Sequence, residues 1–251
     1  MITRAVSIVT YNRCKQIGEV IEGVLSTVPD GTDVYVVDDG STDGTGMEVD
    51  EFTASGVKYY RGPNLGVGAN KNRALYLMQN HHFSCMIEDD LIPQSSGWFE
   101  IYETVAIMTD IHHFCRVQDK TAPEVYASFT RYLADAMELT PVYGSSPRGD
   151  LTFITKKVIA TVGGMNPLFK GVGYAHGEWS DRVAKAGLIS HPNKWVDIVQ
   201  ARDIFKQVGD TTGGRWDDDQ DEIKAQLKKN QQTRKKLKGS GKNIYCPLRL
   251  V

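Results

Sequence analysis

Short apolar runs rich in β-branched residues recur over residues 1–95, and each is followed by polar residues and then by a helical pattern. The runs are Ala5–Thr10, Val34–Val37, Val57–Arg61 and Phe83–Ile87. Between the first two, apolar residues recur at helical spacing, and Asn12 can cap that helix. Buried strands that alternate with helices form an open, mostly parallel sheet with helices on both faces. The sequence therefore predicts an α/β fold.

Composition is that of a folded globular chain, because 41% of the 251 residues are hydrophobic and 24% are charged. No secretory signal follows Met1, and no run of about 18 apolar residues is present. The four cysteines form no C-x-x-C pair and are Cys14, Cys85, Cys115 and Cys246. We therefore expect a cytoplasmic protein with unpaired, mostly buried thiols and no zinc knuckle.

Polar residues follow each of the four predicted strands. The segments are Thr10–Arg13, Asp38–Thr45, Arg61–Gly66 and Glu88–Asp90. In an open parallel sheet, ligands bind outside the carboxyl ends of the strands, where the strand order reverses. Three consecutive acids repel one another unless a cation lies between them, and carboxylates suit Mg²⁺ or Mn²⁺, which bind substrate phosphates. With Tyr11 available to stack on a base, the pattern indicates a nucleoside diphosphate and a divalent metal.

These segments together resemble the inverting glycosyltransferases of family 2, which have the GT-A fold. The resemblance rests on Ser7–Arg13, Val36–Thr45, Asn64–Gly66, Ala69–Ala74 and Glu88–Asp90, in the family's order. It implies a single α/β domain of the GT-A type. It also implies an enzyme that transfers a hexosyl or pentosyl group, with inversion, from a nucleotide-sugar such as a UDP-sugar to an acceptor hydroxyl, using Mn²⁺ or Mg²⁺.

The resemblance also assigns roles to residues near the strand ends. The implied donor-binding residues are Thr10, Tyr11, Arg13, Asp39, Lys71 and Asp89. Lys71 would approach the diphosphate, Asp89 would lie near the ribose, and Asp90 would be the metal ligand of the DXD motif. Glu88 stands where the family often has its first Asp. His191 is a further candidate metal ligand, because some relatives complete the metal site with a late histidine.

The segment Gly163–Leu188 resembles the acceptor side of the family, where an acidic residue often serves as general base. If the segment is aligned with the family on Arg182, His176 falls near the position of the base. If it is aligned on the family's acidic residue, Glu178 and Asp181 fall there. We favour Glu178, because an acid at a helix N-terminus is held ionised. His176 and Asp181 remain alternatives, since histidine has the better ordinary pKa for this task and Asp181 could instead pair with a neighbouring cation.

The C-terminal region changes character. Lys224–Lys242 holds eight basic residues and no acid, which leaves 21 basic residues against 31 acidic residues elsewhere. We expect a solvated, partly helical extension that could bind nucleic acid or an anionic membrane. The acceptor is then a saccharide or glycoconjugate, or a hydroxymethylated nucleic-acid base. The expected divisions are a donor half at 1–95, an acceptor half at 96–215 and the acidic and basic extension at 216–251.

Two other classes of protein compete with the glycosyltransferase. A nucleotide-binding module that has lost turnover would explain altered acids on the acceptor side. A nucleotidyltransferase would share the fold and the metal, but it needs a glycine-rich basic loop after the first strand, and Tyr11–Arg13 is not one. The adjacent pairs His81–His82 and His112–His113 predict surface or packing roles, because neighbouring side chains on a strand point apart.

Overall fold

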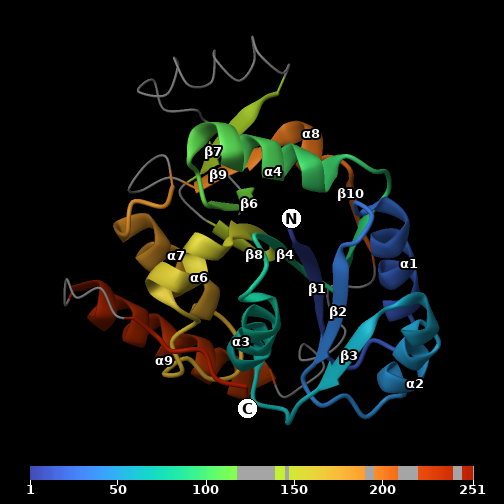
Figure 1. Ribbon diagram of the computed structural model, residues 1–251. Helices are drawn as coiled ribbons and strands as arrows, with labels where there is room; N and C mark the ends of the chain where they lie inside the picture. Colours follow the sequence, from blue (N-terminus) through green and yellow to red (C-terminus); the bar gives the residue numbers. More distant parts are fainter. Residues whose placement is uncertain (118–138, 145–146, 190–194, 209–219, 240–244, 251) are drawn as a thin grey trace.

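The computed structural model describes residues 1–117, 139–144, 147–189, 195–208, 220–239 and 245–250. Its centre is one sheet with the strand order β3-β2-β1-β4-β8-β6-β9-β7 (Figure 1). These strands are β1 (Arg4–Thr10), β2 (Asp33–Asp38), β3 (Lys58–Arg61), β4 (Phe83–Glu88), β6 (His113–Val117), β7 (Pro141–Gly144), β8 (Pro147–Thr155) and β9 (Trp195–Ile198). A small second sheet pairs β5 (Leu91–Pro93) with β10 (Phe205–Gln207).

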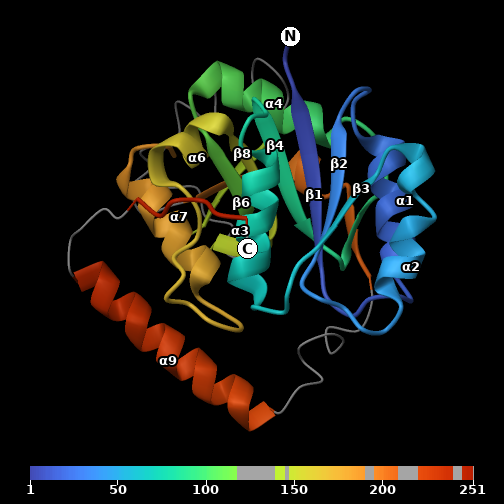
Figure 2. The ribbon, with the colours of Figure 1, turned by 60° about the horizontal axis from the view of Figure 1, so that its bottom comes forward.

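Helices cover both faces of the large sheet. One face packs against α1 (Ile17–Thr27), α2 (Thr45–Asp50), α4 (Trp98–Thr109) and α8 (Val199–Arg202). The other packs against α3 (Val67–Met78), α6 (Lys156–Val162) and α7 (Ala175–Lys185). A short 3₁₀ turn, η1 (Thr53–Ser55), precedes β3, and α9 (Gln220–Gly239) lies outside α7 (Figure 2). The two apolar clusters on the two faces confirm the predicted α/β architecture.

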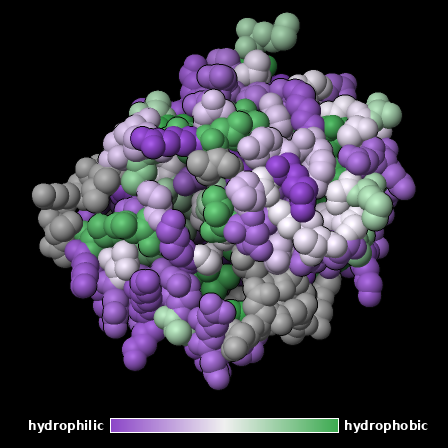
Figure 3. All heavy atoms as spheres, turned by 90° about the horizontal axis from the view of Figure 1, so that it is seen from below, coloured by the Kyte–Doolittle hydropathy of each residue, from purple (hydrophilic) through white to green (hydrophobic). Residues whose placement is uncertain are grey.

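The strand order reverses beside β1. This strand pairs in parallel with β2 on one side and with β4 on the other. The register sets Thr10 opposite Asp38 and Val9 opposite Glu88, so the residues that follow these strands emerge at one edge of the sheet. Figure 3 shows this edge, seen from below. It is the place where open α/β sheets bind ligands.

Local details differ from the prediction in two places. The expected cap at Asn12 is wrong, because α1 begins at Ile17 and Asn12 instead has a φ of 53°. Its side-chain oxygen accepts the Thr42 N–H at 2.9 Å, so Asn12 joins two loops. The helix α4 was not predicted, because its aromatic and β-branched residues are apolar on most sides and lack a clear helical period.

The basic C-terminal segment is anchored to the rest of the fold. Asn230 on α9 is buried, and its side-chain amide donates to the carbonyls of Lys170 at 2.8 Å, Val172 at 2.9 Å and Gly173 at 3.2 Å. A side chain at Gly173 would meet Leu227. The outer face of α9 is hydrophilic, at the lower left of Figure 3. The expectation of a solvated extension therefore describes only the outer face of this helix.

The cysteines are unpaired and mostly buried, as the sequence predicted. Cys14, Cys85, Cys115 and Cys246 are all free, and the last three are buried. Among the helices that the structure describes, none combines the length and apolar character required to cross a bilayer.

Candidate active site at the carboxyl ends of β1 and β4

The loop after β1 is fixed to the loop after β2. The Asn12 N–H donates to Ser41 Oγ at 2.7 Å, and the Arg13 N–H donates to Thr45 Oγ1 at 2.8 Å. The Thr10 carbonyl accepts the N–H of Asp39 at 3.0 Å. Two of the segments singled out in the sequence therefore form one wall of the site.

Asp89 joins this wall to the end of β4. Its carboxylate accepts the Tyr11 N–H and the Arg13 Nε–H, each at 3.3 Å. Burial raises the pKa of Asp89 to about 6, with Glu88 and Asp90 adding to the rise and Arg13 opposing it. The structure thus brings Tyr11, Arg13 and Asp89 together, and their roles toward a donor stay predictions.

Asp90 has an oxygen suited to a cation. Its Oδ1 is buried and has no hydrogen-bond partner among the residues described, whereas Oδ2 accepts from the Gln207 side chain at 3.1 Å. Burial, and then the negative charge of Glu88, raise the pKa of Asp90. A carboxylate oxygen that is left without a donor next to other acids fits Mg²⁺ or Mn²⁺, both of which prefer oxygen ligands.

Lys71 lies between the acids and a cavity. Its side chain is 2% exposed, its ammonium pairs with the carboxylate of Glu88, and it donates to the Gly149 carbonyl at 2.9 Å. The cavity has a volume of about 280 Å³, and its wall includes Lys71, Glu88, Gly149, His176 and Arg234. An ion pair of Lys71 and Glu88 therefore lies at the wall of this cavity, and the role of Lys71 toward a diphosphate stays a prediction.

Asp39 is engaged within the protein. Its carboxylate accepts the N–H groups of Leu65 at 3.0 Å and Gly66 at 2.8 Å, and it pairs with the buried guanidinium of Arg73 at 2.8 Å. Gly66 has a φ of 100°, and a side chain there would lie 2.8 Å from the backbone of Gly171. Asp39 therefore shapes the loop before α3, which contacts Gly171, and its role toward a donor stays a prediction.

The three candidate bases lie in different surroundings. His176 borders the cavity, where burial and the nearby charge of Lys71 lower its pKa well below the usual value. Glu178 is buried and pairs with Arg182 at 2.9 Å, and Asp181 pairs with Arg234 at 2.9 Å. Neither acid belongs to the wall of the cavity that contains Lys71. His191 lies outside the described residues.

The structure also adds residues that the sequence alone did not identify. Asp150 pairs with Arg116 at 2.9 Å and with Arg148 at 2.8 Å. The register sets Leu151 opposite Ile87, which brings Asp150 close to Glu88. Asp150 comes close to Glu88 only because β8 pairs antiparallel with β4. The sequence predicted a mostly parallel sheet of alternating strands and helices, so it did not indicate this pairing.

Solved structures with the same fold place the chain in the GT-A class of glycosyltransferase folds. A mannosyltransferase from Pyrobaculum calidifontis, PcManGT in complex with GDP-Man and Mn²⁺, has a TM-score of 0.56 and 18% identity over 73% of this chain and 52% of that one. GalNAc-T7 with UDP, GalNAc and Mn²⁺ has a TM-score of 0.62 and 13% identity over 78% of this chain and 42% of that one. S. aureus TarS, residues 1–349, has a TM-score of 0.52 and 16% identity over 72% and 54%.

The chain belongs to glycosyl transferase family 2, because the sequence profile of that family matches residues 5–131, which is half of the chain. No curated protein matches the sequence. The chain spans only 42–54% of the length of the three structural relatives named above, and at these identities the likeness concerns the fold. The resemblance inferred from the motifs is confirmed.

Proposed function

We propose that this protein is a metal-dependent glycosyltransferase that moves a sugar from a nucleotide-sugar, in the first instance a UDP-sugar, to an acceptor hydroxyl with inversion. One observation carries the proposal. The Lys71 ammonium and the carboxylates of Glu88, Asp89 and Asp90 converge where the strand order reverses. Binding of a diphosphate with its divalent cation would use both charges of this group.

The donor side supplies contacts for each part of the nucleotide. Tyr11 and Arg13 lie at the end of β1 beside Asp89, which suits a nucleoside. Lys71, at the cavity wall, suits the diphosphate. Two of the structural relatives named above were solved with Mn²⁺ and with GDP-Man or UDP, which supports the same ligand class here.

Asp90 would hold the divalent cation, with Glu88 beside it. A Mn²⁺ or Mg²⁺ ion bound there would supply positive charge that stabilises the departing diphosphate. The contribution of the chain is to hold Asp90 through Gln207 at 3.1 Å and to keep Lys71 against Glu88. These contacts would hold Asp90 in place for the cation and Lys71 in place for the diphosphate.

The acceptor hydroxyl would lose its proton at His176. Of the three candidates named from the sequence, His176 alone borders the cavity with Lys71 and Glu88. Glu178 pairs with Arg182 and Asp181 pairs with Arg234, and neither acid lines this cavity. Inversion follows if the acceptor oxygen attacks the sugar carbon from the side opposite the diphosphate in a single displacement.

A binding experiment tests the donor side. Isothermal titration of UDP and GDP with Mn²⁺ should give saturable binding to the native protein and markedly weaker binding to Lys71→Gln. Lys58→Gln serves as the control, since Lys58 is 52% exposed and pairs with Asp33 away from the cavity. Equal binding by the native protein and Lys71→Gln, with the fold of both checked by circular dichroism, would contradict the proposal.

A further inference from the structure

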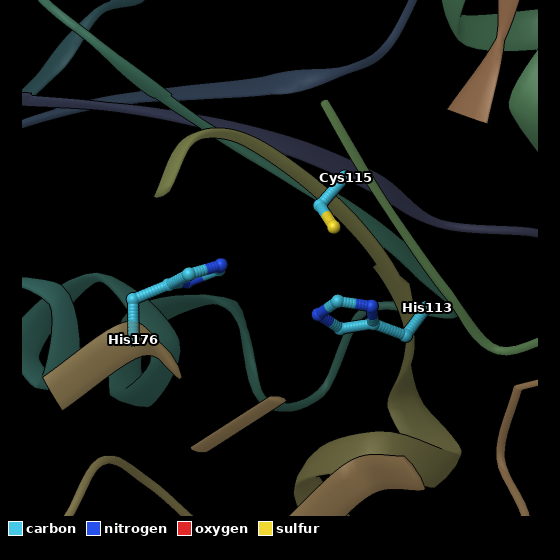
Figure 4. A group of neighbouring side chains, drawn as sticks. All are labelled: His113, Cys115 and His176. Carbon is cyan, nitrogen blue, oxygen red and sulfur yellow. The ribbon is translucent and has the colours of Figure 1, made fainter. Parts of the chain in front are cut away.

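Strand β6 and helix α7 bring three nitrogen and sulfur donors together beside the cavity. His113 and Cys115 are two positions apart on β6, so their side chains share one face of the strand. His176 comes from the first turn of α7 and points toward them (Figure 4). One ligand atom of each residue lies within 4.8 Å of the ligand atoms of the other two.

These groups are buried and poorly satisfied. His113 and Cys115 are fully buried, and His176 is partly buried. The Nδ1 atoms of both histidines are buried without a hydrogen-bond partner among the described residues. The Nε2 atoms of His113 and His176 lie 3.4 and 3.3 Å from Ser180 Oγ, so the Nδ1 atoms are the ring nitrogens left without a partner. A buried imidazole nitrogen without a partner is unfavourable unless an ion or a water occupies the space.

We propose that His113, Cys115 and His176 form a binding site for Zn²⁺. Two imidazoles and a thiolate are the ligands that zinc prefers, whereas Mn²⁺ and Mg²⁺ prefer the oxygen atoms offered by Asp90. Three protein ligands leave a fourth position for water. The sequence did not indicate this site. The side chains of the adjacent residues His112 and His113 point apart, and His176, which lies near His113, follows it by more than sixty residues in the chain.

The zinc site deepens the proposed function and rests on it in one respect, that the acceptor hydroxyl loses its proton in the cavity beside His176. With zinc bound, the imidazole would be a ligand and a water on the ion would be the base, because zinc lowers the pKa of bound water to about 7 and this water can release a proton to solvent. It would then take the proton of the acceptor hydroxyl. The acceptor oxygen bonds to the sugar carbon as the bond to the diphosphate breaks.

Metal analysis of the purified protein tests the site without any substrate. Protein purified without a metal-affinity step should contain zinc in a one-to-one ratio by plasma mass spectrometry, and replacement of zinc by Co²⁺ should give a thiolate-to-cobalt absorption band. Cys115→Ser and His176→Gln should lose the zinc and the band. Cys85→Ser, which alters another buried thiol on β4, should keep both.

Two further results separate this inference from the proposed function. Asp90→Asn should keep its zinc while losing Mn²⁺-dependent nucleotide binding. The zinc site is refuted if the native protein contains no zinc and takes up neither Zn²⁺ nor Co²⁺ on titration, or if His176→Gln binds zinc as the native protein does. His176 is at the cavity wall and partly exposed, so this variant is the one expected to fold normally.

Discussion

The carboxylate of Glu178 accepts a hydrogen bond from Nε of Arg182 at 2.9 Å, and both side chains are buried. The same guanidinium donates to the carbonyls of Val162 at 2.5 Å and Gly164 at 2.6 Å. This one arginine therefore ties α7 to the end of α6, and Glu178 balances its charge. An acid in this position stabilises the fold and is a poor candidate for receiving a proton from a substrate.

We expect Glu178→Ala to destabilise the protein by about 3–5 kcal/mol, because it leaves a buried guanidinium without its counter-charge. Chemical denaturation measures this decrease in stability. In protein stripped of zinc, His176→Gln should leave the free energy of unfolding nearly unchanged, because it removes no buried charge. In the native protein it should lower turnover by about 10²–10⁴-fold, the range for loss of a proton acceptor. If Glu178→Gln folds normally and abolishes turnover while His176→Gln is active, the base is Glu178 after all.

Residues 1–95 could be predicted from the sequence because their signals are local. Each strand is a short apolar run, and the polar residues that matter follow it directly, as in Thr10–Arg13 and Glu88–Asp90. Parallel pairing then brings the strand ends together without further information. The same logic could not reveal that Asp39 faces Arg73, since that contact depends on how the loop before α3 folds.

The region after residue 95 was harder to predict because its contacts join distant segments. Asp150 reaches Glu88 through an antiparallel pairing, and His113 reaches His176 across a strand and a helix. Asn230 is buried only because three carbonyls of the loop before α7 surround its amide. None of these contacts leaves a periodic pattern in the sequence. The burial of Asn230 on α9 was therefore not visible, and the basic segment resembled a solvated tail.

The pH dependence of stability should report on Asp197. Burial raises its pKa to about 7, opposed by hydrogen bonds from Tyr102 and its own backbone neighbour Ile198 and by the charges of Arg202 and Arg116. The folded protein therefore keeps this proton between about pH 4 and 7 while the unfolded chain releases it. Its contribution to the free energy of unfolding must fall as the pH rises through that window.

Asp197→Asn removes this titration and retains an acceptor for the Tyr102 hydroxyl, which donates at 2.6 Å. Urea denaturation at pH 5 and pH 7.5 should show that the native protein loses stability relative to the variant as the pH rises. A difference between the two proteins that does not vary with pH would mean that Asp197 ionises at an ordinary pH.

We expect Arg234 to contribute to binding of the nucleotide donor, whereas Lys238 should not. Both pair with Asp181, at 2.9 and 3.7 Å, but only Arg234 also borders the cavity beside Lys71. Arg234→Gln should weaken binding of the nucleoside diphosphate about tenfold, the usual effect of removing one charge-assisted hydrogen bond. Lys238→Gln is the matched control, and equal effects of the two variants in titration calorimetry would limit α9 to a structural role.

Nucleic-acid binding by α9 can be tested without removing the helix, whose buried face would disappear on truncation. Four of the exposed lysines on α9 are Lys228, Lys229, Lys235 and Lys236. Their joint replacement by Gln should weaken binding to duplex DNA and flatten the logarithmic salt dependence by about 0.9 for each phosphate that the protein no longer neutralises. Replacement of the exposed Lys156 and Lys157 is the control. If the native protein shows no salt-dependent binding, the acceptor is a saccharide or glycoconjugate.

The most direct test of the central claim is the release of nucleoside diphosphate from a panel of UDP-sugars and GDP-sugars in the presence of Mn²⁺. The native protein should cleave at least one donor, and the exposed control Asp30→Asn should match it. Asp90→Asn should lower the rate by about 10²-fold or more, because it removes the charge of the carboxylate that holds the cation. Undiminished release by Asp90→Asn, or no release from any donor by the native protein, would contradict a metal-dependent glycosyltransferase centred on Asp90.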